Sequence, residues 1–212
     1  MRIGVLSDTH VSGSGRRVLP PRLWDDFAGV ELILHAGDLI SPRVISDLET
    51  IAPVLAIAGN NDSPALHLPL FRRLQLEGVI VGMAHGDRYA LDAAASTSST
   101  YGSAQPAGSA QPVGSAQPAA RKRVPGSLPF PGNGQTSAFA LSHVPDAAVM
   151  IFGHSHRPLI ARATIAGEGL EPKRRVLLLN PGSPTDKRWS HNFGVALLQI
   201  KDGAAHAQAL LW

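Results

Sequence analysis

The sequence contains no cysteine. Without thiols the chain can form neither a disulfide nor a thiolate metal site, so a metal ion could be held only by oxygen atoms or histidine nitrogens. The missing thiolates also argue against a structural zinc site. A cysteine-free chain suits either redox compartment, so other features must indicate the location.

Long hydrophobic runs are also absent. Although 44% of the 212 residues are hydrophobic, no run approaches the roughly 18 consecutive apolar residues of a membrane span. The first ten residues enter a strand-like run at once and lack the succession of basic, apolar and small residues typical of a signal peptide. These absences predict a soluble, cytoplasmic protein without a membrane partner.

Several common catalytic fingerprints are missing. There is no G-x-S-x-G elbow, so serine hydrolase chemistry has no support, and neither a P-loop nor a Rossmann glycine pattern occurs. The net charge of +3 and the pI of about 9.7 suit an anionic substrate. The tight basic cluster at 121–123 lies in a low-complexity segment, and we interpret it as solvated rather than as a nucleic-acid site.

Short apolar, β-branched runs recur along the chain and are typical of buried strands. They predict strands at 2–7, 31–35, 53–58, 79–84, 147–152, 158–163, 176–179 and 193–200. Helices are expected at 20–27, 41–51 and 136–143. The helix at 41–51 has the clearest start, because a serine followed by a proline provides a capping hydroxyl and a favourable first turn. The order of elements indicates a layered α/β domain with two sheets or one mixed sheet.

Residues 93–135 depart from this pattern. They are rich in Ser, Gly, Ala, Pro and Gln, and the sequence GSAQP occurs three times, starting at Gly102, Gly108 and Gly114. A segment with so little apolar surface to bury cannot offset its chain entropy. We therefore predict a single domain over 1–212, a length that can bury a substantial core, with a disordered loop insertion at 93–135 that carries no chemistry.

Polar clusters follow five of the predicted strands. They are Asp8-Thr9-His10, His35-Ala36-Gly37-Asp38, Gly59-Asn60-Asn61-Asp62, His85-Gly86-Asp87 and Gly153-His154-Ser155-His156. Each cluster lies just past the carboxyl end of a strand, where open α/β sheets hold their ligands. Any one of them alone could be a turn or a surface histidine, but together and in this order they indicate a metal site.

The spacing within the clusters has a geometric meaning. In an extended chain, residues two apart point the same way and lie roughly 6.6 Å apart, so Asp8 and His10 can face one metal ion. On the same basis, His154 and His156 can straddle two ions roughly 3.5–4 Å apart. The glycines at 37, 59, 86 and 153 let the backbone turn sharply and approach the ions.

Taken together, D-x-H, G-D, G-N-x-D, H-G and G-H-x-H resemble the signature of the calcineurin-like metallophosphoesterases. The segment Asn180-Pro181-Gly182-Ser183-Pro184-Thr185 makes the chain similar to the small prokaryotic YfcE-type phosphodiesterases. The resemblance covers nearly the whole chain except the insertion. It implies a four-layer αββα sandwich.

The resemblance also implies a dinuclear metal centre. Its seven ligands would be Asp8, His10 and His156 on one ion, Asn60, His85 and His154 on the other, and Asp38 bridging both. Oxygen and imidazole donors suit several divalent ions, and we expect Mn²⁺ in preference to Zn²⁺, Ni²⁺, Co²⁺ or Fe. We expect three further side chains to hold the ligands in position without binding the ions themselves: His35, Asp62 and Asn180.

The predicted activity is hydrolysis of a small phosphate ester by attack of a metal-bridging hydroxide. Two divalent ions attract the phosphate anion and lower the pKa of the attacking water to about 7. Asn61 stands where many members of the family carry a histidine thought to protonate the leaving oxygen. Because an amide cannot release a proton at neutral pH, we expect phosphodiesters or activated esters to be preferred, with water or Asp62 supplying any proton needed.

Two other functions share this pattern. One is a non-catalytic metal-binding adaptor on the same fold, of the kind found in retromer, although all seven ligand positions are filled here, which favours an enzyme. The other is a nuclease, which would need a basic groove beside the metals, so nucleic acid is a less favoured partner than a small ester. The sequence leaves the natural substrate and the oligomeric state open.

Overall fold

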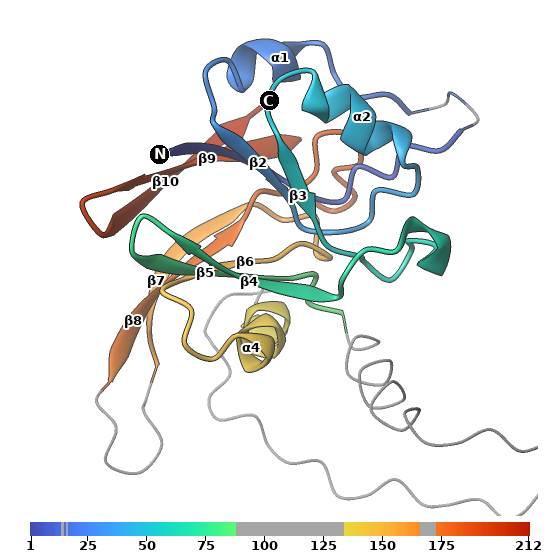
Figure 1. Cartoon of the computed structure of the whole chain (residues 1–212). Helices are drawn as coiled ribbons and strands as arrows, with labels where there is room; N and C mark the ends of the chain where they lie inside the picture. The colour runs from blue at the N-terminus through green and yellow to red at the C-terminus, as the bar shows by residue number, and fades with distance from the viewer. Residues whose placement is uncertain (14, 16, 88–133, 166–172) are drawn as a thin grey trace, which may run out of the picture.

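A computed structural model describes residues 1–13, 15, 17–87, 134–165 and 173–212, and it contains two five-stranded mixed sheets (Figure 1). The first sheet has the order β10 (Ala204–Leu211), β9 (Gly194–Lys201), β1 (Arg2–Leu6), β2 (Leu32–His35) and β3 (Val54–Ala56). The second has the order β4 (Phe71–Leu76), β5 (Val79–Ala84), β6 (Val149–Ile151), β8 (Arg174–Asn180) and β7 (Leu159–Ile165).

The two sheets pack face to face, and helices cover both outer faces. Helices α1 (Arg22–Asp26) and α2 (Arg43–Glu49) lie over the first sheet, and α4 (Gly134–His143) lies against the second (Figure 1). A short 3₁₀ helix, η1 (Pro64–Leu66), follows β3. This is the four-layer αββα sandwich that the resemblance implies.

Three hydrophobic clusters explain why the sequence forms these layers. The central cluster takes alternate side chains from strands of both sheets, such as Val5 and Ile151. The intervening side chains point outward, where Ile33 packs with α1 and α2, and Met150 packs with α4. Because both faces of the inner strands are covered, their sequences are continuous apolar runs rather than alternating ones.

The predicted elements are confirmed with small shifts at their ends, which are the least certain part of any helix or strand. Helix α2 begins at Arg43, two residues later than expected, and the Ser41 hydroxyl accepts a hydrogen bond from the Arg43 N–H at 3.3 Å. Helix α4 begins at Gly134, so the last two residues of the segment 93–135 are helical. The rest of that predicted insertion lies outside the described residues.

Two strands were not predicted, β4 and β10. Both have an alternating pattern of exposed and half-buried residues, and β10 is largely alanine, so neither contains the apolar, β-branched run that identified the other strands. They lie at the outer edges of the two sheets. In the part of the chain that is described, no helix is long and apolar enough to cross a membrane.

The topology brings the polar clusters to one edge of the sandwich. Strands β1, β2 and β3 run parallel in one sheet, and β5, β6 and β8 run parallel in the other. The loops that follow β1 and β2 remain hydrogen-bonded beyond the strands, with the Asp8 N–H donating to Gly37 O at 2.9 Å and the His10 N–H donating to Asp38 O at 2.9 Å. The loop after β6 joins them where the Gly153 N–H donates to His85 O at 3.1 Å.

Candidate metal centre

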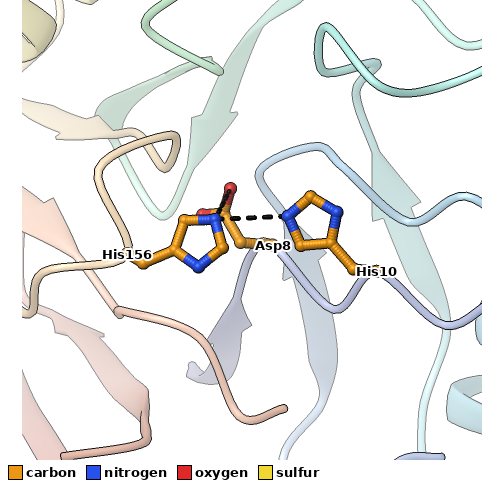
Figure 2. Close-up of side chains that lie close together, drawn as sticks. All are labelled: Asp8, His10 and His156. Carbon is orange, nitrogen blue, oxygen red and sulfur yellow. Dashed lines mark hydrogen bonds and ion pairs between the residues drawn. The ribbon is translucent and has the colours of Figure 1, made fainter. Parts of the chain in front are cut away.

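Carboxylates and imidazoles from both sheets converge at this edge. Asp8 Oδ1 lies 3.3 Å from His156 Nε2 and 3.8 Å from His85 Nε2. Asp38 Oδ2 lies 3.4 Å from His85 Nε2 and 3.5 Å from His10 Nε2. Figure 2 shows the rings of His10 and His156 facing each other beside Asp8, with their Nε2 atoms 3.2 Å apart. Atoms from distant parts of the chain therefore surround one small volume.

The remaining two predicted ligands lie at the same place. His154 Nδ1 is 3.1 Å from Asn60 Oδ1, and the ring of His154 packs edge-on against that of His85 with centroids 5.4 Å apart. The backbone N–H of His154 donates to Asp8 Oδ2 at 3.0 Å. All of the predicted ligands are thus brought together.

Among the described residues, two groups of side chains have ligand atoms within 4.8 Å of one another: Asp8, His10 and His156, and Asp8, Asp38 and His85. The first is the set that the resemblance implies for one ion. Asp8 belongs to both groups, while Asp38 approaches both His85 and His10. Either carboxylate is therefore close enough to both groups to be shared between two ions.

The loops achieve this convergence with a left-handed backbone. The φ angles are 54° for Asp8, 44° for His10, 60° for Asp38, 65° for His154 and 57° for His156. The premise that these loops are extended is therefore wrong, although Asp8 and His10 do face the same small volume as predicted. Left-handed non-glycine residues cost roughly 1–3 kcal/mol each, and such strain clusters at functional sites.

Two histidines are fixed so that Nε2 faces the carboxylates. His85 Nδ1 donates to Ala36 O at 2.7 Å, and His156 Nδ1 donates to Asp186 O. A histidine that donates from one nitrogen to a carbonyl keeps the other nitrogen as a metal ligand. His85 Nε2 is buried and makes no hydrogen bond to any described residue, although it faces two carboxylates. These residues fit a divalent cation, which would give that buried nitrogen a partner.

Burial and mutual charge shift the pKa values of the centre. Burial raises the pKa of Asp8 to about 7, although the charge of His85 and a hydrogen bond from Ser7 oppose this. Burial lowers the pKa of His85, but close contact with Asp38 and the charges of Asp8 and Asp38 outweigh it and raise the pKa to about 10. Burial lowers the pKa of His156 to about 4. At neutral pH the metal-free centre thus holds one imidazolium between two carboxyl groups, beside a neutral His156.

Asn61 and Asp62 hold the Asp38 loop. The backbone N–H of Asn61 donates to Asp38 Oδ1 at 2.8 Å, and its side-chain amide donates to Oδ2 at 2.7 Å. Burial alone would raise the pKa of Asp38, but His85 and these bonds bring it below its usual range. Asp62 accepts the backbone N–H groups of Asp38 at 2.8 Å, Ile40 at 2.7 Å and Gly59 at 2.9 Å. Both side chains therefore position Asp38.

His35 and Asn180 have different surroundings. His35 is fully buried, with Nε2 3.1 Å from the Thr9 hydroxyl, and burial lowers its pKa to about 3, so it is neutral. It therefore supports the loop between Asp8 and His10 rather than a ligand side chain directly. Asn180 donates to Gly153 O and to the Ser155 hydroxyl, both at 3.0 Å, and so supports the loop that carries the histidine pair.

Several residues at this edge were not predicted to belong to the site. The Ser7 hydroxyl donates to Asp8 Oδ2 at 2.7 Å, and the Ser183 hydroxyl donates to Asp8 O at 2.7 Å. Asp186 accepts from His156, and Arg188 Nη2 lies 3.5 Å from His10 Nε2. The segment that carries the last three follows β8, so the rule that polar residues after parallel strands share one edge could have identified it.

We expect Gly153→Ala to disrupt the centre. A Cβ at Gly153 would lie 2.6 Å from Asp8 Oδ2 and 2.9 Å from the Ser7 side chain, whereas a Cβ at Gly13 would meet nothing within 4 Å. Overpacking of this kind costs about 1–3 kcal/mol. Thermal denaturation should show a lower melting temperature for Gly153→Ala and little change for the matched variant Gly13→Ala. Equal melting temperatures would show that the Asp8 loop tolerates displacement.

Comparison with known proteins points to the same family as the sequence motifs do. The family model of the calcineurin-like phosphoesterase superfamily domain matches residues 1–108 and 130–203, and the internal gap in this match lies within the predicted insertion. A probable metallophosphoesterase of Methanothermobacter thermautotrophicus is 34% identical over 189 residues, which cover 89% of this chain and 80% of that protein.

Two solved structures are similar in fold. One is a predicted phosphoesterase from Streptococcus pneumoniae, with a TM-score of 0.58 and 19% identity, covering 99% of this chain and 88% of that one. The other is wild-type Vps29 of Entamoeba histolytica complexed with Zn²⁺, with a TM-score of 0.56 and 18% identity, covering 100% of this chain and 99% of that one. At these identities the two likenesses concern the fold alone.

Proposed function

Since this chain belongs to the calcineurin-like phosphoesterase superfamily, we propose that it hydrolyses phosphate esters with two divalent metal ions and prefers phosphodiesters. The observation that supports the proposal most is the convergence of Asp8 and Asp38 with the Nε2 atoms of three histidines. A buried cluster of this kind is unfavourable unless a cation or protons compensate the carboxylate charge.

The proposed ligand sets are those that the resemblance implies. Asp8, His10 and His156 would hold one ion, Asn60, His85 and His154 the other, and Asp38 would contribute to both. When bound, the ions would supply positive charge for the phosphate and lower the pKa of the attacking water. The protein's own contribution is to hold the ligands rigidly, through the hydrogen bonds that fix Asp38 and the backbone carbonyls that fix two imidazoles.

The surroundings of the leaving group support the diester preference. The amide of Asn61 donates to Asp38, and both oxygens of Asp62 accept backbone N–H groups. Both side chains therefore hold the Asp38 loop, and the amide of Asn61 has no proton to give at neutral pH. Without an acid at this position, esters whose leaving oxygen needs little protonation react best.

An activity panel tests this proposal. Metal-depleted protein is reloaded with Mn²⁺, Co²⁺, Ni²⁺, Zn²⁺ or Fe²⁺ and assayed on bis-p-nitrophenyl phosphate, p-nitrophenyl phosphate, an alkyl monoester and single-stranded DNA. We expect the aryl diester to be hydrolysed fastest, with Mn²⁺ the most effective ion. Comparable turnover of the alkyl monoester would contradict the diester preference. Metal uptake without any hydrolysis would favour the adaptor, and preferential cleavage of DNA would favour the nuclease.

Metal uptake should release protons from the ligands. With a pKa of about 10, His85 is protonated in the metal-free protein at pH 7.5 and must lose that proton to become a ligand. Asp8, with a pKa of about 7, is mostly ionised at pH 7.5 but mostly protonated at pH 6. Calorimetry in buffers of different ionisation enthalpy should therefore detect at least one proton, from His85, at both pH values, with Asp8 adding to it mainly at pH 6 and the metal-bound water mainly at pH 7.5. Absence of proton release at both pH values would exclude His85 as a ligand.

A further inference from the structure

Arg188 reaches the metal centre from the segment that follows β8. Its backbone is left-handed, with φ 44°, and its Nη2 atom lies 3.5 Å from His10 Nε2. The side chain is 41% exposed, so it is open to solvent on its other side. The guanidinium therefore stands between bulk water and a predicted metal ligand.

Arg188 lies beside ligands from two different loops. Its Nη2 atom contacts His10, in the loop after β1, and the ring of His10 stacks on that of His156, in the loop after β6, with centroids 5.0 Å apart. The guanidinium therefore lies next to the centre rather than next to an isolated histidine. A positive group placed this way favours an anion bound at the same edge.

The protein itself leaves the guanidinium weakly paired. Arg188 Nε is 3.8 Å from Asp186 Oδ2, which is beyond hydrogen-bonding distance. The same carboxylate oxygen lies 3.0 Å from Arg17 Nη1. The contact with His10 uses the Nε2 atom proposed to hold an ion. An ion held by that atom would deprive the N–H groups of Arg188 of this partner and would place two positive charges close together. An anion between them would satisfy both.

The next residue, Trp189, is 83% exposed. An indole left in water keeps a large apolar face uncovered, and tryptophan is suited to stacking on a flat ring. Aromatic side chains beside a phosphate-binding cation are a common way to bind aryl or nucleotide groups. The chain neighbours Arg188 and Trp189 thus offer one group for a phosphate and one for a ring.

We propose that Arg188 binds a phosphoryl oxygen of the substrate and that Trp189 stacks on a flat ring esterified to the phosphate. This inference rests on the proposed function and narrows the substrate class to aryl or nucleoside phosphate esters. Arg188 thereby contributes to binding the anion, and Trp189 to the choice of ester.

Ligand binding tests the proposal independently of turnover. Mn²⁺-loaded protein is titrated calorimetrically with inorganic phosphate, methylphosphonate and phenylphosphonate. Arg188→Ala should weaken phosphate binding about 10- to 100-fold, the effect of losing a charge-assisted hydrogen bond. Arg188→Lys should recover part of the affinity, because it keeps the charge but not the planar fork. The matched control Lys187→Ala, which removes the same charge one residue away, should bind phosphate within about twofold of wild type.

The role of Trp189 is tested by comparing the affinity for a phosphonate that carries a ring with the affinity for one that does not. Wild type should bind phenylphosphonate at least about fivefold more tightly than methylphosphonate, and Trp189→Leu should abolish that preference. The proposal is overturned if Arg188→Ala binds phosphate as wild type does, or if Trp189→Leu keeps the preference. If phosphate binding depends on Arg188 but no substrate in the activity panel is hydrolysed, only the proposed function is contradicted. If a substrate is hydrolysed but phosphate binding does not depend on Arg188, only this inference is contradicted.

Discussion

Replacing Asp38 with asparagine is expected to lower kcat on an aryl phosphodiester about a thousandfold or more, because the stabilisation lost is worth several kcal/mol. Asp38 is 1% exposed, and its Oδ2 atom approaches both His85 and His10. The substitution removes the negative charge shared by the two proposed ion sites. It also removes an acceptor, since Asn61 donates to both carboxylate oxygens and an amide can satisfy only one of those donors.

The control for this prediction is Asp146→Asn. Asp146 is half exposed and pairs with Arg73 on β4, so the variant makes the same chemical change outside the polar clusters. We expect Asp146→Asn to keep the activity of wild type. Steady-state kinetics measure the activity of both variants, and circular dichroism confirms that both are folded. Activity of Asp38→Asn within about tenfold of wild type would be too high for a shared ligand.

The second large effect is expected on stability. Asp62→Ala removes the acceptor of three backbone N–H groups, from Asp38, Ile40 and Gly59. At about 1 kcal/mol for each lost bond, the free energy of unfolding should fall by about 3 kcal/mol, since water can reach this half-buried site. For a chain of this size the melting temperature should drop by about 6–12 °C. Activity should fall as well, because Asp38 loses its support.

The comparison with Asp25→Ala isolates this role. Asp25 is exposed, and its removal changes the net charge equally. We expect it to change the melting temperature by no more than about 2 °C. A further variant, Asp62→Asn, separates positioning from proton donation. If Asp62 supplied a proton instead, Asp62→Asn would keep the stability of wild type and lose activity only on esters with poor leaving groups.

The strands that could be predicted from sequence are those covered on both faces. Strands such as β2 and β6 consist entirely of buried residues, so a short apolar run is a sufficient signal. Strand β10, with the sequence AAHAQALL, has half-buried and exposed residues in alternation and little β-branched character. Its pairing with β9 comes from tertiary context that composition does not reveal.

The candidate site was predictable in its residues but not in its backbone. Motif order placed Asp8, Asp38 and the histidines at strand ends, and the parallel strands brought these ends together. The left-handed φ angles of Asp8 and His10 were not predictable, because neither residue type requires them. They depend on bonds to distant segments, such as the one from the Ser183 hydroxyl to Asp8 O. Arg188 was not predicted either: its place after β8 was a signal for the edge it lies on, but its contact with His10 depends on the fold.

The most direct test of the account is the number of divalent ions bound. Metal-depleted protein is reloaded with Mn²⁺, passed through a desalting column and analysed by mass spectrometry of the metal. We expect close to two ions per chain in wild type and in the exposed control His191→Ala, and clearly fewer in His156→Ala. Retention of less than one ion by wild type, or an unchanged metal content in His156→Ala, would contradict a centre built on these side chains.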